Sequence, residues 1–268
     1  MKNNISLICE TLDDVRKKSP LVHNITNLVV TNVTANATLA AGASPVMAHA
    51  PEEVADMVGI ASALVLNIGT LDVNLIDAMV KAGQAANHKN IPVLLDPVGA
   101  GATPLRTDSV MRIMKEVNIN ILRGNASEIS IIGGYGGQVK GVDAVGSFEG
   151  LGDKVRETSQ RLGTVVAVTG ATDYISDGTR LARVYNGHKL LTHVTGTGCM
   201  ASAVIGAFAA VQRDYFMATV AALSYYGAAA ELAAQQAKGP GSFQVALFDS
   251  LYNLTPAALA GLVRVEIE

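Results

Sequence analysis

Short apolar runs alternate with longer amphipathic segments over the first two thirds of the chain. Residues 63–68, 91–96, 118–122 and 164–169 are apolar runs with the length of buried strands. The segments 72–88, 108–117 and 153–162 repeat their apolar residues near a helical period. Strands that alternate with helices predict an α/β fold, in which a mainly parallel central sheet carries helices on both faces.

The last third of the chain has a different pattern. Residues 199–214 and 217–237 are rich in Ala and predict two long buried helices, followed by a helix over 242–256 and a closing strand in LVRVEIE. The pairs Asp177-Gly178 and Asn186-Gly187 predict hairpin turns. Since no linker, low-complexity stretch or repeat is present, we expect residues 1–268 to form one domain.

The composition indicates a large core and argues against several kinds of partner. Charged residues make up 16% of the chain, against about 25% in average soluble domains. The formal net charge is -3, and the densest basic cluster, Arg16 to Lys18, is typical of a solvated helix end, so we expect no nucleic-acid partner. We also expect no membrane span and no secretory signal at the polar N-terminus. The two distant cysteines, Cys9 and Cys199, suit a reducing cytoplasm.

Polar residues stand where the predicted strands end. Asp96, Arg123, Asn125 and Thr169 each come at or just after an apolar run. In open α/β sheets, ligands bind beyond the carboxyl ends of the strands. These four side chains therefore predict the place of a binding site.

A glycine loop precedes the first Ala-rich helix. Residues 195–199 read Thr-Gly-Thr-Gly-Cys, and the free N–H groups around Thr197 and Gly198 would form an anion-binding cradle at the positive end of the helix dipole. The glycines could equally well end one element and cap the next. The loop has neither the Lys of a Walker A motif nor the GxGxxG spacing of a nicotinamide enzyme.

Two carboxylates could hold magnesium near this cradle. Asp96 and Glu128 offer the hard oxygen ligands that Mg²⁺ prefers together with substrate phosphates. The spacing of Asn125 and Glu128 alone favours a helix capping box, and both roles are compatible if water joins Glu128 to the metal. Arg123 could grip a phosphate in a bidentate manner or form a surface salt bridge.

Several segments together resemble the hydroxyethylthiazole kinases of the ribokinase-like superfamily. The matching stretches are PLVHNITNLVVTNVTANATLAAGASPVMAHAPEEV (20–54), LLDPVGAGAT (94–103), ILRGNASEI (121–129), VAVTGATDYISDG (166–178) and VTGTGCMASA (194–203). The resemblance implies a three-layer α/β/α fold and transfer of the γ-phosphate of ATP to 4-methyl-5-(2-hydroxyethyl)thiazole, a thiamine precursor. It also implies a homotrimer with active sites at subunit interfaces.

The resemblance also implies roles for individual residues. Those on the substrate side are Met47, whose flexible thioether suits a small polarizable ring, Gly196 and, more weakly, Asn24. The ATP-phosphate contacts are Arg123 and Thr169, and the acidic residues near magnesium are Asp96 and Glu128. From the residues alone, we would interpret Met47 as an ordinary core residue and His23 as a structural histidine.

Cys199 stands where many ribokinase-like enzymes carry the Asp that is taken as the catalytic base. The resemblance implies that Cys is common here among thiazole kinases. Phosphoryl transfer through a loose transition state depends mostly on positioning and electrostatics. Our hypothesis is that Cys199 orients the alcohol while the N–H groups of the loop stabilise the transferred group.

Three other functions compete with this interpretation. The nearest is a kinase for another vitamin precursor, such as a pyrimidine or pyridoxal alcohol. A nucleotide-dependent hydrate dehydratase would share the architecture, but Cys199 and the HNITN segment disfavour it. A non-catalytic nucleotide-binding module is disfavoured by the joint presence of Asp96, Glu128 and the glycine loop.

Overall fold

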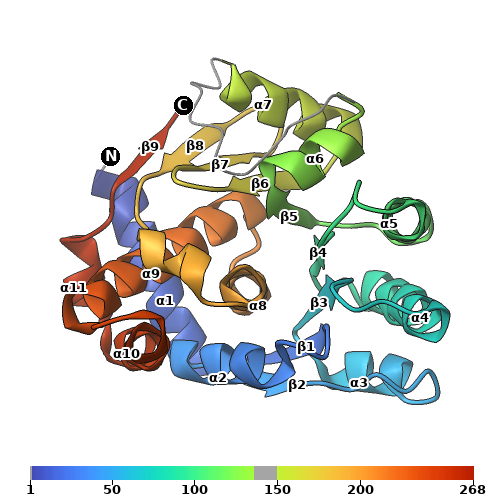
Figure 1. The fold of residues 1–268 in the computed structure, drawn as a ribbon, viewed down its shortest axis with the longest axis horizontal. Helices are drawn as coiled ribbons and strands as arrows, with labels where there is room; N and C mark the ends of the chain where they lie inside the picture. Colours follow the sequence, from blue (N-terminus) through green and yellow to red (C-terminus); the bar gives the residue numbers. More distant parts are fainter. Residues whose placement is uncertain (1, 136–149) are drawn as a thin grey trace.

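The described part of the chain forms a nine-stranded sheet between two layers of helices (Figure 1). The computed structural model describes residues 2–135 and 150–268. The strand order is β2-β1-β3-β4-β5-β6-β7-β8-β9; strands β2 to β6 run parallel, and the last three pair antiparallel. The strands are β1 (Leu21–Ile25), β2 (Ser44–Val46), β3 (Ala63–Asn67), β4 (Val93–Asp96), β5 (Ile121–Asn125), β6 (Val165–Thr169), β7 (Asp173–Ser176), β8 (Leu181–Val184) and β9 (Val265–Ile267).

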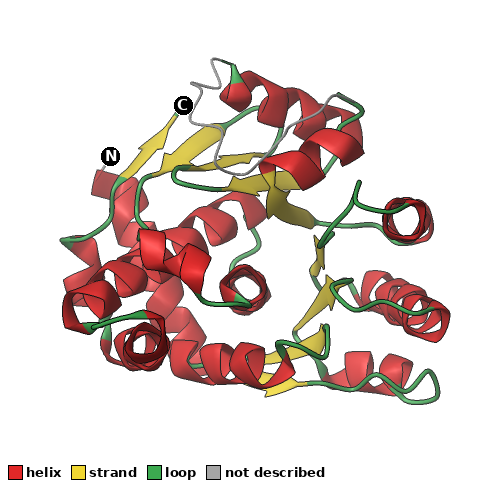
Figure 2. Cartoon of the chain, in the orientation of Figure 1, coloured by secondary structure: helices red, strands yellow, loops and turns green. Residues whose placement is uncertain are grey.

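The helices divide between the two faces of the sheet (Figure 2). One face is covered by α3 (Val54–Ile60), α4 (Val73–Lys89), α5 (Pro104–Glu116), α6 (Ala126–Ile132) and α7 (Leu151–Leu162). The other face is covered by α8 (Thr197–Val211) and α9 (Tyr215–Gln236), with α1 (Lys2–Lys18), α2 (Thr31–Ala41), α10 (Pro240–Asn253) and α11 (Pro256–Ala260) packed around them; a short 3-10 helix, η1 (Lys189–His193), precedes α8. This three-layer α/β/α arrangement confirms the predicted fold class.

Most of the predicted elements are present. The runs 63–68, 91–96 and 164–169 form β3, β4 and β6, the Ala-rich segments form α8 and α9, and LVRVEIE contains β9. The helix expected over 108–117 begins earlier, at Pro104. The Thr103 hydroxyl accepts from the Arg106 N–H and caps the helix, and a Pro at the first position needs no N–H partner.

Two local predictions were wrong. The strand expected over 118–122 runs over Ile121–Asn125, because pairing with β6 continues to Asn125 opposite Thr169, so Arg123 and Asn125 lie within the strand. Asp177-Gly178 does join β7 to β8, but Asn186-Gly187 is not a hairpin turn. The buried Asn186 side chain donates to the Leu262 carbonyl at 2.8 Å, and this long-range bond directs the chain toward η1.

Helix α8 packs closely against the sheet at Gly206. A Cβ atom added at Gly206 would stand 2.5 Å from Cγ2 of Val65 in β3 and 3.3 Å from Cγ1 of Val22 in β1. Real Cβ atoms do not approach other atoms at 2.5 Å. The missing side chain thus sets the distance at which α8 crosses the strands.

We expect Gly206→Ala to lower the free energy of unfolding by about 1–3 kcal/mol, because the added methyl group forces α8 away from Val65. The control is Gly59→Ala in α3, where nothing lies within 4 Å of the added Cβ and the better helix former should add about 0.5–1 kcal/mol. Urea unfolding followed by circular dichroism measures both changes. Equal stabilisation by the two substitutions would contradict the close-packing argument.

Candidate active site

A row of polar side chains lies at the carboxyl ends of the parallel strands, on the face covered by α8. Asn67, Asp96, Arg123 and Thr169 come from β3, β4, β5 and β6 in turn. Each stands two residues after a strand residue that packs in the α8 core, so strand alternation points all four toward this helix. The sheet thereby gathers residues that are separated by about a hundred positions in the chain.

One carboxylate oxygen ties this row to α8. Asp96 is buried, and its Oδ2 accepts from Asn67 Nδ2 at 3.0 Å and from Ser202 Oγ at 2.7 Å. Arg123 Nη1 lies 3.4 Å from the same oxygen. Burial raises the pKa of the Asp96 carboxyl group, and the Arg123 charge and the hydrogen bonds oppose that effect.

The second oxygen of Asp96 is suited to a cation. Its Oδ1 is buried and, within the described residues, has no hydrogen-bond partner. A buried carboxylate with a free oxygen is stabilised by an added positive charge. Asp96 therefore has the chemistry of a ligand for a hard divalent ion.

Glu128 forms the capping box that its spacing favours. Its Oε2 accepts from the Asn125 N–H at 2.8 Å, and the Asn125 side chain accepts from the Glu128 N–H at 2.9 Å. The other oxygen, Oε1, accepts from the Gly99 N–H at 2.8 Å. Because both oxygens already bind backbone amides, a metal near Glu128 would be reached most simply through water.

The start of α8 is a cradle open to an anion. Gly196 precedes the helix at φ +83°, and Met200 is the residue whose N–H first bonds back, to the Gly196 carbonyl. No side chain among the described residues caps this end, so the amides of the first turn stay available. A Cβ at Gly198 would stand 2.9 Å from Nη1 of Arg123, so glycine lets the guanidinium group approach the helix start.

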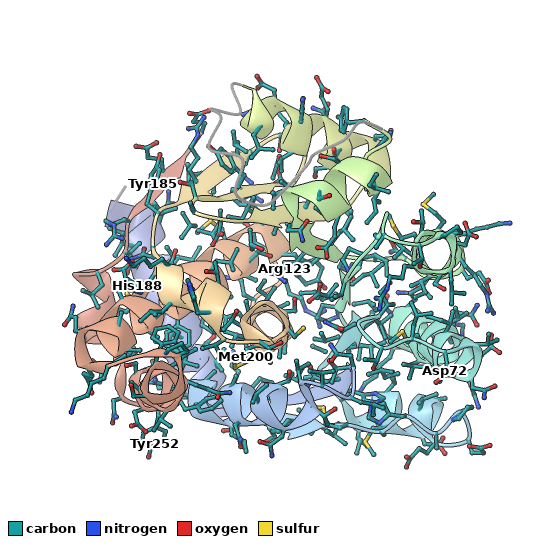
Figure 3. All side chains as sticks on the ribbon, viewed as in Figure 1. Asp72, Arg123, Tyr185, His188, Met200 and Tyr252 are labelled. Atoms are coloured by element: carbon teal, nitrogen blue, oxygen red, sulfur yellow. The ribbon has the colours of Figure 1, made fainter. Side chains whose placement is uncertain are left out.

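The phosphate-side residues converge on this cradle. Arg123 lies between β5 and α8 (Figure 3), and its Nη2 donates to Thr169 Oγ1 at 2.5 Å. The Thr197 hydroxyl donates to the Leu191 carbonyl at 2.7 Å, so this hydroxyl is already used within the protein. Arg123 therefore lies next to both Thr169 and Gly198, and Thr197 adjoins Gly198 in the chain; their role as phosphate contacts stays a prediction.

Cys199 lies beside the polar row. Its Sγ accepts from Asn67 Nδ2 at 3.2 Å and from Asn27 Nδ2 at 3.6 Å. Burial raises the pKa of the Cys199 thiol to about 11. The side chain is thus a neutral thiol near pH 7.

Asn27, Asn67 and Ser202 were not singled out from the sequence. Asn67 ends an apolar strand in the way Asp96 does, so the same rule identifies it. Ser202 follows Cys199 by three residues on the helix, a spacing that places both on one face. Asn27 lies in the HNITN segment, but only the fold brings it to Asn67.

Two of the predicted thiazole-side residues, Met47 and Asn24, lie at the β1–β2 end of the parallel strands, whereas Gly196 lies at the start of α8. Met47 directly follows the edge strand β2 and is half-buried. Asn24 is fully buried in β1; its Nδ2 donates to the Val22 carbonyl at 3.1 Å, and its Oδ1 has no partner among the described residues. The buried His23 bonds through Nε2 to the Ala48 carbonyl at 2.9 Å, in keeping with a structural role.

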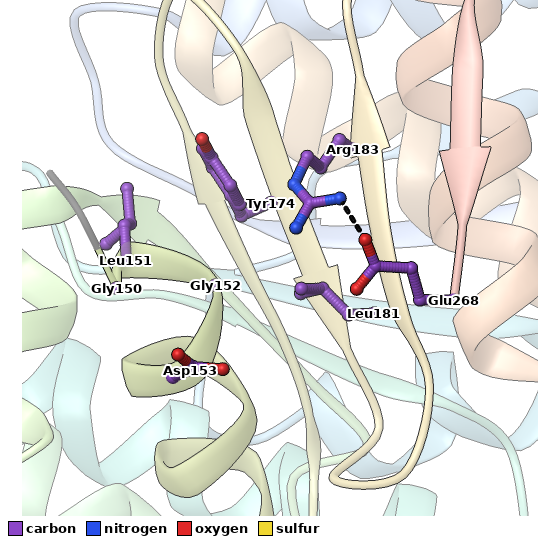
Figure 4. Close-up of a pocket in the computed structure, with 8 residues that line it drawn as sticks. All are labelled: Gly150, Leu151, Gly152, Asp153, Tyr174, Leu181, Arg183 and Glu268. Carbon is purple, nitrogen blue, oxygen red and sulfur yellow. Dashed lines mark hydrogen bonds and ion pairs between the residues drawn. The ribbon is translucent and has the colours of Figure 1, made fainter. Parts of the chain in front are cut away.

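A separate cavity of about 160 Å³ lies on the opposite face of the sheet (Figure 4). It is lined by residues of α7, β7, β8 and the C-terminus, among them Tyr174, Arg183 and Glu268. The Arg183 and Glu268 side chains form an ion pair across it at 2.5 Å. The candidate site does not include this cavity, which shares none of its residues.

Over residues 2–135 and 150–268, no group of three or more His, Cys, Asp or Glu side chains is arranged to hold a metal ion. In the same part of the chain, no helix has the length and apolarity needed to cross a membrane.

Comparisons with known proteins agree on one family. The profile of the "Hydroxyethylthiazole kinase family" matches residues 12–257. A protein of Moorella thermoacetica named hydroxyethylthiazole kinase is 60% identical over 94% of this chain and 95% of its own length. The structure of a hydroxyethylthiazole kinase protein from Pyrococcus horikoshii OT3 superposes with a TM-score of 0.90, at 48% identity and 100% coverage of both chains.

A more distant structure shares the fold. The pyridoxal kinase of Staphylococcus aureus in complex with AMP-PCP and pyridoxal has a TM-score of 0.66 at 13% identity, covering 93% of this chain and 98% of that one. At this identity the likeness shows a shared fold alone.

The first residue of β7, Asp173, carries a buried carboxyl group. Burial raises the pKa of Asp173 from 3.8 to about 7, although its Oδ1 accepts from the Gly170 N–H at 3.0 Å. The folded state therefore holds this proton more tightly than the unfolded state does, so the Asp173 contribution to stability is present below about pH 4 and is lost as the pH rises through about 7.

We expect Asp173→Asn to remove this pH dependence, since the amide oxygen can still accept from Gly170 while no charge is buried. The variant should gain up to roughly 4 kcal/mol over the wild type between about pH 4 and about pH 8. Urea unfolding over this pH range measures the difference. Parallel curves for the two proteins would contradict the assignment.

Proposed function

The chain belongs to the hydroxyethylthiazole kinase family, and we propose that it transfers the γ-phosphate of ATP to the hydroxyl group of 4-methyl-5-(2-hydroxyethyl)thiazole in thiamine biosynthesis or salvage. The observation that carries this proposal is the uncapped start of α8, where Gly198 lets Arg123 approach the first helical turn. Backbone amides, a helix dipole and a guanidinium group together suit a phosphoryl group in transfer.

The reaction exchanges one phosphorus–oxygen bond for another. The alcohol oxygen bonds to the γ-phosphorus, and the bond from that phosphorus to the β–γ bridging oxygen breaks, so ADP leaves. The hydroxyl proton passes to an oxygen of the transferred phosphate. The protein has to hold the two reactants in line and stabilise the charge on the phosphoryl oxygens.

We assign the phosphates to one end of the site and the thiazole to the other. Arg123 and Thr169, together with the N–H groups of Thr197 and Gly198, contact ATP phosphates. Gly196 lies on the alcohol side of the loop. A Cβ there would stand 2.6 Å from Val30, so only glycine keeps this turn narrow.

Met47 and Asn24 complete the thiazole side of the proposed site. Both lie on the β1–β2 edge of the parallel sheet, where Val46 pairs with His23. The Oδ1 atom of Asn24 is an acceptor without a donor among the described residues, and the thioether of Met47 suits a sulfur-containing ring.

The residues present fit Mg²⁺ as a cofactor. Asp96 would hold the ion through its unpartnered Oδ1, and Glu128 would contribute through a water molecule, since its own oxygens bind amides. When bound, the ion would neutralise charge on the ATP phosphates. Activity that persists after complete chelation of divalent ions would refute this assignment.

We propose a cytoplasmic homotrimer of single-domain subunits, with active sites at the subunit interfaces. Leu28 and Val29 directly follow Asn27 of the site, and their side chains are 81% and 66% exposed. Apolar residues beside a polar site are typical of a surface that another subunit covers. Sedimentation equilibrium tests the trimer, and a monomer at micromolar concentration would refute it.

Substrate profiling tests the proposed function. Purified protein with ATP and Mg²⁺ should release ADP when the thiazole alcohol is added, and the phosphorylated alcohol should appear in equal amount by mass spectrometry. The pyrimidine alcohol of thiamine and pyridoxal serve as rival acceptors. A higher kcat/KM for either rival, or ADP release independent of any alcohol, would contradict the proposal.

Substitution of Cys199 tests its role. Because the half-buried thiol is neutral, it should orient the alcohol and not remove its proton, so Cys199→Ala should lower kcat by about tenfold to a hundredfold. Cys199→Asp should remain active. A collapse of Cys199→Ala activity by many orders of magnitude, with substrate binding intact, would show that the thiol is essential to the chemistry.

A further inference from the structure

The hydrogen bonds around Cys199 have a direction that a backbone group fixes. Asn67 Oδ1 lies 3.0 Å from the N–H of Gly69, which can only donate. The amide oxygen of Asn67 must therefore face Gly69, and its Nδ2 must face the other way. The two ends of the Asn67 amide are thus told apart by the Gly69 N–H itself.

The orientation of the Asn67 amide in turn fixes the orientation of the Asn27 amide. Asn67 Oδ1 also lies 2.8 Å from the Asn27 amide, and an oxygen needs a donor there, so the group is Nδ2 of Asn27. Asn67 Nδ2 uses one hydrogen on Asp96 Oδ2 at 3.0 Å and the other on Cys199 Sγ at 3.2 Å. Asn27 Nδ2 has its second hydrogen left for the same sulfur, at 3.6 Å.

The thiol of Cys199 thus faces two N–H donors on its inner side. A neutral thiol has two sulfur lone pairs and one proton, and it is mostly protonated at neutral pH. Both lone pairs are directed to the two amides. Among the described residues, no acceptor is hydrogen-bonded to the thiol proton, so this proton is free to point out of the sheet.

We propose that Asn27 and Asn67 are positioning residues that hold the Cys199 thiol as a hydrogen-bond donor to the oxygen of the bound alcohol. This inference rests on the proposed kinase function and specifies how the alcohol is positioned in its site. An alcohol oxygen that accepts the S–H keeps a second lone pair to attack phosphorus. The sulfur has no lone pair left for the alcohol proton, so Cys199 does not act as the base.

Steady-state kinetics test the role of Asn67, whose amide contacts both Cys199 and Asp96. Asn67→Leu keeps the volume of the side chain but removes both donors, and we expect kcat to fall about tenfold or more while KM for ATP changes by less than about twofold. The matched control is Asn36→Leu, which removes an Asn–Asn bond of 3.1 Å on the exposed side of α2 and should leave kcat unchanged. Equal kcat values for the two variants would overturn the proposal.

A double-mutant cycle separates positioning from general structural support. If Asn67 acts through the thiol, Asn67→Leu should cost several-fold less in kcat when Cys199 is already Ala. Independent effects of the two substitutions, multiplying in the double variant, would show that Asn67 does not act through Cys199.

Infrared spectroscopy measures the S–H stretching band of Cys199 directly. In a Cys9→Ser background Cys199 is the one remaining thiol, and Cys9 lies outside the site in α1. Adding the thiazole alcohol without ATP should shift the S–H stretching band to lower frequency, because donation weakens the S–H bond. The shift should be smaller in Asn67→Leu. An unshifted band, or a band that disappears because the thiol loses its proton, would overturn the proposal.

Asn67 is buried, so circular dichroism and thermal unfolding must first show that the Leu variant folds. If it does not, Asn27→Ser replaces it in all three experiments with the same expected directions, since Asn27 also donates to the sulfur. Failure of the proposed function gives a different result: the Cys9→Ser protein would then phosphorylate no thiazole alcohol at all. Normal phosphorylation with unchanged kcat in the amide variants overturns the positioning roles alone.

Discussion

The buried carboxylate of Asp96 joins the sheet to the helix that begins the site. Removing a carboxylate from water costs several kcal/mol unless hydrogen bonds and opposite charge offset the cost. Here the donors come from three elements: Asn67 in β3, Arg123 in β5 and Ser202 in α8. Because Oδ2 accepts from all three donors, the N-terminal half of α8 is held over the strand ends, and Oδ1 keeps no partner among the described residues.

Small residues make that geometry possible. Gly206 lets α8 approach Val65 of the sheet, and Gly198 lets the Arg123 guanidinium group approach the start of the same helix. The positive end of the helix dipole and the Arg123 charge therefore act at one place. An anion bound there meets preorganised donors, which is the condition for lowering the barrier of a phosphoryl transfer.

The sequence was informative where structure is local and silent where it depends on distant contacts. Asp96 and Thr169 end apolar runs, so the strand-end rule placed both correctly. Arg123 was placed one step outside its strand, because the pairing that extends β5 comes from β6, about 40 residues away. The hairpin assigned to Asn186-Gly187 failed for the same reason, since the Asn186 side chain is held by Leu262. The Asn27–Asn67–Cys199 cluster joins three elements and has no local pattern to reveal it.

The surroundings of Cys199 explain how one scaffold can accommodate different side chains at this position. Asn27 and Asn67 both present donors, so the position suits any group that accepts hydrogen bonds, a carboxylate included. A carboxylate would, however, add a second negative charge near Asp96, whose charge already disfavours ionisation of the thiol. A neutral thiol accepts the same two bonds without repelling Asp96 or an incoming phosphate. Whether a carboxylate or a thiol suits this position therefore depends on whether the site needs a base or only a well-placed alcohol.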